Sequence, residues 1–198
     1  MTVYTLFGQP SAPASGAGDA GDYTFGVQFS VSQAATLTGM WFYSPPTYTD
    51  LPSTIALYAV SGQSLVHSET PSWSGAAGSG WVRAPFSSPP SLTASTSYKG
   101  VVLHTAGSQW YAATAHYWDS GAGASGITSG PLSAPNNAGG DGGQDTFNVG
   151  GSLTYPSGSF NAANYWLDPE VTATAAAGGG APSPLVVPQA AVMQAANW

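Results

Sequence analysis

Few side chains in this sequence could perform chemistry. The 198 residues contain nine acids, three histidines, two basic residues and no cysteine. The absence of cysteine excludes disulfides, thiolate metal sites and cysteine nucleophiles. Asp168 and Glu170 share one face of an extended segment, as a pair of catalytic carboxylates would, but no other feature supports that role. We instead interpret Asp168 as a carboxylate bonded to backbone N–H groups of a nearby turn, because structural carboxylates outnumber catalytic ones.

The histidines do not indicate an enzyme either. His67, His104 and His116 lack the paired spacing of a zinc-binding helix, and no nucleophile-elbow sequence is present. Residue counting leaves Ser-His-Asp chemistry open, and a glycosidase is the alternative from the enzyme class. It would need two carboxylates roughly 5–10 Å apart in a groove, whereas most acids here fall in loop sequences. We therefore predict no catalytic residues, no cofactor and no enzymatic activity.

One segment is rich in oxygen ligands. Residues 136–145 read Asn-Asn-Ala-Gly-Gly-Asp-Gly-Gly-Gln-Asp. Calcium prefers such oxygens, but the spacing is not that of a known calcium-binding loop. We predict no metal site and interpret the segment as a glycine-rich loop, with calcium binding left as the alternative.

A second set of residues could bind sugars. Aromatic side chains that flank loop sequences could stack on sugar rings or anchor a protein partner. Alternatively they fill the core, where large aromatic residues supply most of the buried area. The candidates for glycan contact are Trp73, Trp110, Tyr111, Tyr117 and Trp118.

The composition limits the partners. Charged residues make up 6% of the chain, and Arg83 and Lys99 are its only basic residues. A phosphate backbone requires several Lys or Arg to displace counterions, so we expect no nucleic-acid partner, and for the same reason no anionic membrane. No apolar segment approaches the roughly 20 residues that span a bilayer. A polar, weakly charged surface suits neutral partners such as glycans or another protein coat.

The elements that must position these residues are short strands. Residues 25–31 alternate, with Phe25, Val27, Phe29 and Val31 on one face. Residues 35–43 place Leu37, Gly39, Trp41 and Tyr43 on one face. Because turn signals recur and helical periodicity is absent before residue 186, we predict an all-β, antiparallel two-sheet sandwich, jelly-roll or immunoglobulin-like. Further strands are expected at 54–60 and 65–69, which form a hairpin, and at 80–86, 92–95, 98–104, 110–118, 147–149, 152–154 and 164–171, with a long loop at 119–143.

The composition changes after the last predicted strand. We divide the chain into a sandwich domain at 1–172, an Ala/Gly/Pro linker at 173–184 and an apolar docking arm at 185–198. The arm carries no charge, and we predict that it binds a neighbouring protein; the alternative is that it folds back on its own domain. The docking residues are Leu185, Val186, Val187, Val192, Met193 and Trp198.

The body resembles a domain of unknown function found in bacterial extracellular multidomain proteins and in phage virion proteins. The resemblance rests on motifs in the family's order, which include 25–29, 39–43, 55–58, 80–82, 97–98, 130–135 and the closing segment 159–168. It implies a β-sandwich without assigned catalytic residues. The extracellular members lie beside adhesion and carbohydrate-active domains, which implies a binding role.

These features lead to a functional expectation. The sequence shows no signal peptide, so we expect synthesis in the host cytoplasm and a place in the virion. We predict a non-enzymatic bacteriophage structural protein, namely a capsid decoration, head-fibre or tail-associated protein. Its expected partners are the major capsid protein, other virion proteins and sibling subunits in a homo-oligomer. The alternative is a carbohydrate-binding module that recognises host surface glycans.

Overall fold

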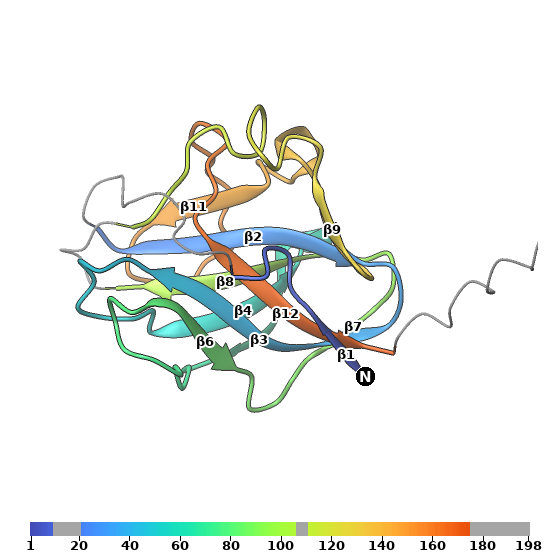
Figure 1. Ribbon diagram of the computed structural model, residues 1–198, viewed down its shortest axis with the longest axis horizontal. Coiled ribbons are helices and arrows are strands. Elements are labelled where there is room, and N and C mark those ends of the chain that lie inside the picture. The colour runs from blue at the N-terminus through green and yellow to red at the C-terminus, as the bar shows by residue number, and fades with distance from the viewer. Residues whose placement is uncertain (10–20, 106–110, 175–198) are drawn as a thin grey trace, which may run out of the picture.

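In the part of the chain that the structure describes, twelve strands form two antiparallel sheets that pack face to face (Figure 1). The computed structural model describes residues 1–9, 21–105 and 111–174. Sheet A has the strand order β1 (Thr2–Tyr4), β12 (Leu167–Ala173), β3 (Ala35–Ser44) and β6 (Gly80–Pro85), with β7 (Ser91–Leu92) also paired to β3. Sheet B has the order β5 (Ser64–Glu69), β4 (Thr54–Ala59), β8 (Ser97–His104), β2 (Tyr23–Val31), β10 (Leu132–Ala134) and β9 (Ile127–Ser129), with β11 (Asp145–Val149) paired to β2. The predicted β-sandwich is confirmed.

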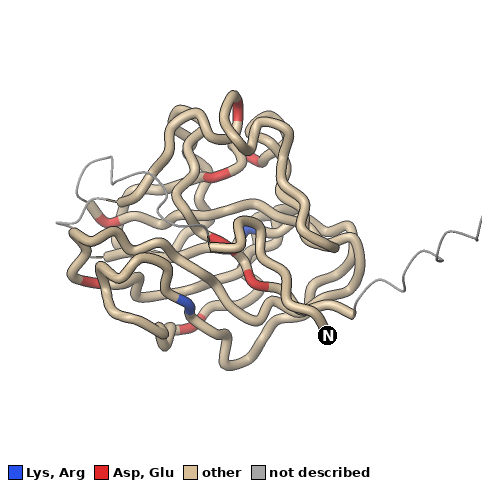
Figure 2. The backbone as a smooth tube through the Cα atoms, in the orientation of Figure 1, with Lys and Arg blue, Asp and Glu red and all other residues tan. Residues whose placement is uncertain are grey.

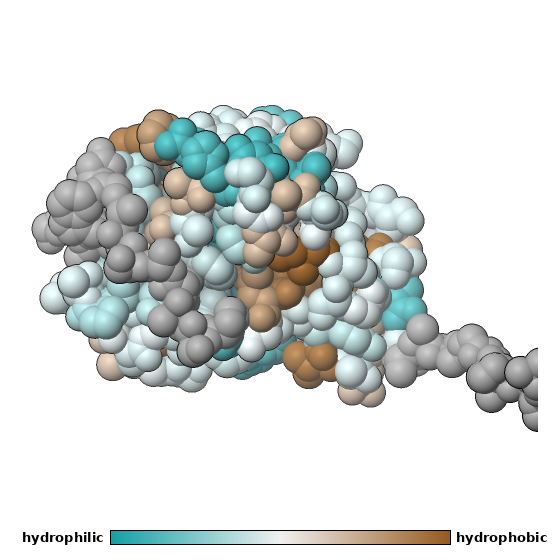
Figure 3. All heavy atoms as spheres, turned by 45° about the horizontal axis from the view of Figure 1, so that its top comes forward, coloured by the Kyte–Doolittle hydropathy of each residue, from teal (hydrophilic) through white to brown (hydrophobic). Residues whose placement is uncertain are grey.

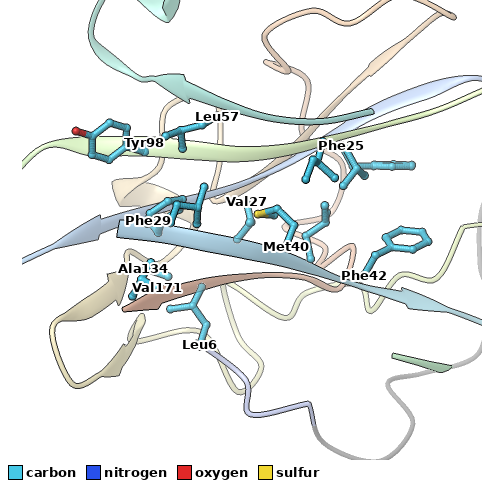
Figure 4. Packing of buried hydrophobic residues seen from close by; sticks show 14 of the residues in the cluster. Leu6, Phe25, Val27, Phe29, Met40, Phe42, Leu57, Tyr98, Ala134 and Val171 are labelled. Atoms are coloured by element: carbon cyan, nitrogen blue, oxygen red, sulfur yellow. The ribbon is translucent and has the colours of Figure 1, made fainter. Parts of the chain in front are cut away.

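The core lies between the two sheets. The apolar face of β2 supplies Phe25, Val27 and Phe29, and β3 supplies Met40 and Phe42 (Figure 4). The hairpin predicted from residues 54–69 is confirmed, because β4 and β5 pair on either side of a short 3₁₀ turn (Ser61–Gln63). Burial of this apolar surface, at about 25 cal/mol per Å², is the main favourable term in folding.

The second face of β2 is covered as well, although its small and polar residues predict exposure. Thr24 and Gln28 are buried on this outer face of sheet B. Pro156 packs so closely over Gly26 that a Cβ there would lie 2.6 Å from the proline ring. The segment after β11 therefore forms a third layer at this end of the sandwich.

A bulge divides β3 into two parts with different inward faces. Leu37 faces Val171 of β12 and Gly39 faces Glu170, so Thr38 is an extra residue without an opposite partner. Beyond the bulge, Met40 and Phe42 point into the core in place of Gly39, Trp41 and Tyr43. The prediction that Leu37 shares a face with these last three residues is therefore wrong, because one inserted residue reverses the alternation.

The last strand starts later than predicted. Trp166 has a φ of 57°, in the left-handed region that a bulky residue rarely adopts. Its backbone N–H donates to Asn164 Oδ1 at 2.7 Å, an arrangement typical of an Asx turn. This turn sends Tyr165 into the main core and Trp166 to the opposite side of sheet A, and β12 begins at Leu167.

Three other predicted strands differ from the structure. The sequence predicts a strand at 110–118. The described part of this segment, 111–118, forms no strand and contains one isolated bridge, between Thr114 and Asn164. His116 has a φ of 58°, and its carbonyl oxygen accepts hydrogen bonds from the Ser120 and Gly121 N–H groups, which closes a turn. Residues 152–154 form no strand. In place of the strand predicted at 92–95, the structure has the two-residue β7, which ends at Leu92. The predicted loop at 119–143 contains the β9–β10 hairpin and a 3₁₀ turn at Asn137–Gly139.

The predicted role of Asp168 is confirmed. Its Oδ1 accepts the Leu6 N–H at 2.6 Å, and its Oδ2 accepts the Phe7 N–H at 2.9 Å and Gln9 Nε2 at 2.8 Å. Burial raises the pKa of Asp168 to about 7, against the opposing effect of these donors. This one carboxylate fixes the segment that follows β1 against β12, although the two regions are about 160 residues apart in sequence.

We expect Asp168→Ala to reduce the free energy of unfolding by about 3 kcal/mol or more, because it leaves buried N–H groups without acceptors. Chemical denaturation of the purified protein measures this change. The exposed Asp119 offers a matched control, whose alanine variant should be about as stable as the parent. Equal stability of the Asp168 variant and the parent would contradict this account.

Candidate binding surface

The charged residues are scattered over the fold (Figure 2). On sheet A, Arg83 and Glu170 form an ion pair. Arg83 Nη2 and Nε donate to Glu170 Oε1 and Oε2 at 2.6 and 2.8 Å on the outer face of this sheet. Trp41 and Thr38 also donate to the same carboxylate. The Arg83 guanidinium holds the pKa of Glu170 below its usual value. Glu170 is therefore a structural ion-pair partner.

Lys99, the second basic residue, lies buried on the outer face of sheet B. Its ammonium donates to the carbonyl oxygens of Asp141 (2.6 Å) and Pro156 (3.0 Å) and to Thr146 Oγ1 (3.0 Å). It also lies 4.6 Å from the centre of the Tyr155 ring. Burial lowers its pKa to about 8. Lys99 thus ties the third layer to the sheet beneath it.

The oxygen-rich segment 136–145 is organised by its own bonds and by this lysine. The side-chain oxygens of Asn136 and Asn137 each accept a backbone N–H of the same segment, at 3.1 and 3.3 Å. The Asp141 carbonyl oxygen faces the Lys99 ammonium. These oxygens already accept hydrogen bonds from the loop backbone and from the Lys99 ammonium, so the geometry does not favour calcium binding. Among the described residues, no three His, Cys, Asp or Glu side chains gather as metal ligands.

A Ser-His-acid group is present but has the wrong connections for nucleophilic catalysis. His67 Nε2 lies 3.0 Å from Glu69 Oε2, and Ser87 donates its N–H and its hydroxyl to the same carboxylate. A serine nucleophile would have to donate its hydroxyl to the histidine. Here the serine and the histidine both bind the acid, and this arrangement fastens the segment after β6 to the end of β5.

The remaining buried carboxylate belongs to Asp145. Its Oδ2 accepts the Tyr165 N–H at 2.8 Å, while Oδ1 has no hydrogen-bond partner. Burial raises the pKa of Asp145 to about 8. The Tyr165 N–H opposes this increase, as does the nearby Trp118 indole N–H, which does not reach hydrogen-bond geometry. Burial therefore favours the protonated form of Asp145 in the folded protein.

An apolar hollow of about 250 Å³ opens on the surface beside this buried region. Its lining contains no charged residue and consists of Tyr23, Tyr111, Phe147, Val149 and Phe160. Val149 and Phe160 remain 73% and 63% exposed, the highest values for large apolar side chains outside the first residue of the described chain. On the face drawn in Figure 3, apolar surface is broken into separate patches.

The base of the hollow belongs to a connected group of aromatic rings. The Tyr23 ring lies 5.3 Å from Tyr111 and 5.2 Å from Phe25, and Phe25 lies 4.9 Å from Tyr165. Rings packed at these distances stabilise one another beyond their burial alone. The wall of the hollow is therefore continuous with the core and is held in a fixed shape.

The loop that presents Phe160 is held by backbone hydrogen bonds. Gly158 and Phe147 exchange two, at 2.7 and 2.9 Å, and Thr114 exchanges two with Asn164. Between these bridges, Asn161 and Ala162 have φ values of 50° and 44°. Consecutive non-glycine residues in the left-handed region cost free energy, and such strain is concentrated at functional sites. The backbone thus exposes a phenylalanine at some energetic cost.

Of the five aromatic residues considered as glycan contacts, the four that the structure describes do not form one platform. Tyr111 lines the hollow, and half-buried Tyr117 lies 5.3 Å from Trp166 on the other side of sheet A. Trp73 packs against Phe42 and donates Nε1 to the Pro52 carbonyl oxygen at 2.8 Å.

Trp118 is 0% exposed and fills the core, which is the alternative that the sequence left open for these rings. Trp110 lies outside the described residues. Sequence reasoning missed Tyr23, Phe147, Val149 and Phe160, although a lone aromatic residue within the turn sequence Ser-Gly-Ser-Phe-Asn was a usable signal for Phe160.

Fold and surface together define an all-β sandwich domain whose buried charges are structural and whose aromatic hollow is open. The chain belongs to the family described as Domain of unknown function (DUF4082), whose model matches residues 9–167. The resemblance seen in the sequence is thereby confirmed. No curated protein matches the chain. No helix among the described residues is long and apolar enough to cross a membrane.

The burial of Asp145 leads to a prediction about pH. An unfolded aspartate releases its proton near pH 4, whereas folded Asp145 keeps it up to about pH 8. Folding takes up a proton in this window, so the free energy of unfolding should fall as the pH rises from about 4.5 to about 7.5. Asp145→Asn should flatten this slope, as measured by denaturation at several pH values.

Asp168 contributes a slope of the same sign up to its pKa of about 7, so the Asn variant of Asp145 should retain part of the dependence. Asp119→Asn serves as the exposed control and should retain all of it. An unchanged slope in the Asp145 variant would show that this carboxyl is ionised in the folded protein.

Proposed function

We propose that this protein is a non-enzymatic structural component of a bacteriophage particle, namely a capsid decoration, head-fibre or tail-associated protein. In this proposal the arm at 185–198 binds the major capsid protein, another virion protein or a sibling subunit. The sandwich projects from the particle and presents its surface hollow. The arm lies outside the described residues, and its role rests on its uncharged, apolar sequence.

The observation that supports this proposal is the pairing of β12, the last strand that the structure describes. β12 pairs with β1 on one side and with β3 on the other, and it buries Val171 and Ala173 in the core. Both sides of β12 are therefore occupied at Val171–Ala173, so this end of the strand does not need the apolar arm to complete its pairing. An apolar segment without such a role is available for a partner.

The bonding of the acids supports a non-enzymatic role. Asp168, Glu170, Asp145 and Glu69 each accept hydrogen bonds that fix the fold. The hollow is lined by no carboxylate, whereas glycoside hydrolysis requires two of them on either side of the bond that is cleaved. This surface is therefore suited to binding a ligand without catalysing a reaction.

Deletion of residues 182–198 should leave a folded domain that no longer joins phage particles. Incorporation is measured by immunoblotting purified particles assembled with the full or shortened chain, and folding by thermal denaturation. A Gly178→Ser, Gly179→Ser, Gly180→Ser variant is the matched control, since it alters the linker without removing apolar side chains. Normal incorporation of the shortened chain would refute attachment through the arm.

The aromatic hollow favours a second candidate, binding of neutral host glycans. Stacking on aromatic rings without a nearby charge suits an uncharged sugar. A glycan array should then detect binding that Phe160→Ser reduces at least about tenfold, because the most exposed ring of the hollow is removed. Val3→Ser, in which an exposed apolar residue of β1 changes outside the hollow, is the control. Absence of binding across the array would end this candidate.

A further inference from the structure

Strand β5, at one edge of sheet B, differs from the other strands in its exposure. β5 pairs with β4 along one side, from Ser64 opposite Ala59 to Glu69 opposite Ile55. No strand among the described residues pairs with its other side. Leu65 and Val66 are 50% and 45% exposed, and no residue of β5 is fully buried. An extended edge with apolar side chains is a template for another strand.

The other outer strands are short or covered. β1 and β9 have three residues each. β6 ends at Pro85, and its free side is bridged by Ser74, whose N–H donates to the Arg83 carbonyl oxygen at 2.7 Å. The free side of β11 is bridged by Gly158. Short length, proline and covering segments are the means by which proteins prevent edge-to-edge pairing.

β5 lacks most of these protections. It has six residues and contains no proline, lysine or arginine. A bulge interrupts its ladder to β4, because Leu57 faces His67 and Tyr58 faces Leu65, which leaves Val66 without an opposite residue. The bulge modifies the pairing on the inner side but leaves the outer side of the strand uncovered.

We propose that β5 is a self-association surface, at which the β5 strands of two copies of this chain pair antiparallel and join their B sheets. A two-fold axis through such a pair makes the strand its own complement. Pairing centred between Val66 and His67 places all six residues of one β5 opposite the β5 of the other copy. Leu65 then lies opposite Ser68 and Glu69 opposite Ser64, so the two acids do not face each other. The absence of lysine and arginine removes like-charge repulsion between cations.

The apolar side chains supply the favourable term. Leu65 and Val66 lose exposed surface when a second strand covers the edge, while the outward backbone N–H and C=O groups exchange water for hydrogen bonds with the partner strand. Pairing through β5 requires neither the C-terminal arm nor a particle. A chain that does not self-associate through β5 can therefore be distinguished from a chain that does not attach to a virion.

Sedimentation equilibrium of the full chain tests the proposal. The weight-average mass should rise from monomer toward dimer with concentration, and Leu65→Lys, Val66→Lys should weaken the dimer at least about tenfold. Val149→Lys, which changes the apolar residue with 73% exposure on β11, is the matched control and should leave association unchanged. Thermal denaturation of both variants checks that they fold.

Amide hydrogen exchange locates the interface independently of the variants. β5 amides should become more protected at high protein concentration, and this protection should disappear in the lysine variant. A full chain that stays monomeric at every concentration, or a dimer that the β5 substitutions leave intact, would overturn the proposal. Protection that appears on another surface alone would also overturn it.

Discussion

The sandwich depends on one buried carboxylate that joins the two ends of the folded body. Asp168 on β12 binds the N–H groups that follow β1, and Phe7 is thereby placed 5.5 Å from Trp166. Without this acceptor, the backbone of the first nine residues would keep the three residue pairs of β1 but lose its bonds to Asp168. The same strand directs Glu170 to Arg83 on the outer face of sheet A. A single segment therefore orders the N-terminus, the outer ion pair and the adjoining aromatic cluster.

The scarcity of charge has a structural counterpart. Of the two basic residues, Lys99 is enclosed by carbonyl oxygens and Arg83 is bonded to an acid, so neither is available to steer a charged partner. The surface that remains is polar or apolar but weakly charged. Contacts on such a surface depend on shape, hydrogen bonds and apolar burial, which are little affected by salt. The hollow and the β5 edge are both surfaces of this type.

Sequence patterns predicted the fold more fully than the candidate site. Alternation in Phe25–Val31 and the turn at 61–64 were sufficient to place two sheets and a hairpin, because the period of two and the turn residues are local signals. The bulge at Thr38 and the left-handed Trp166 depend on tertiary contacts, so the faces of β3 and the start of β12 were misjudged. The segment 111–118 has the composition of a strand, yet its rings pack from turns. The hollow combines β2, β11 and two loops, and no local pattern predicts which distant rings meet.

The placement of Lys99 and Arg83 also determines how the molecule meets proteases. Enzymes that cut after basic residues have just two target bonds in the entire chain, and these lie within β8 and β6. Cleavage there requires a strand paired on both sides to leave its sheet, or, at Arg83, the loss of a bidentate ion pair. Trypsin-like digestion of the folded protein is thus limited by local unfolding of these strands.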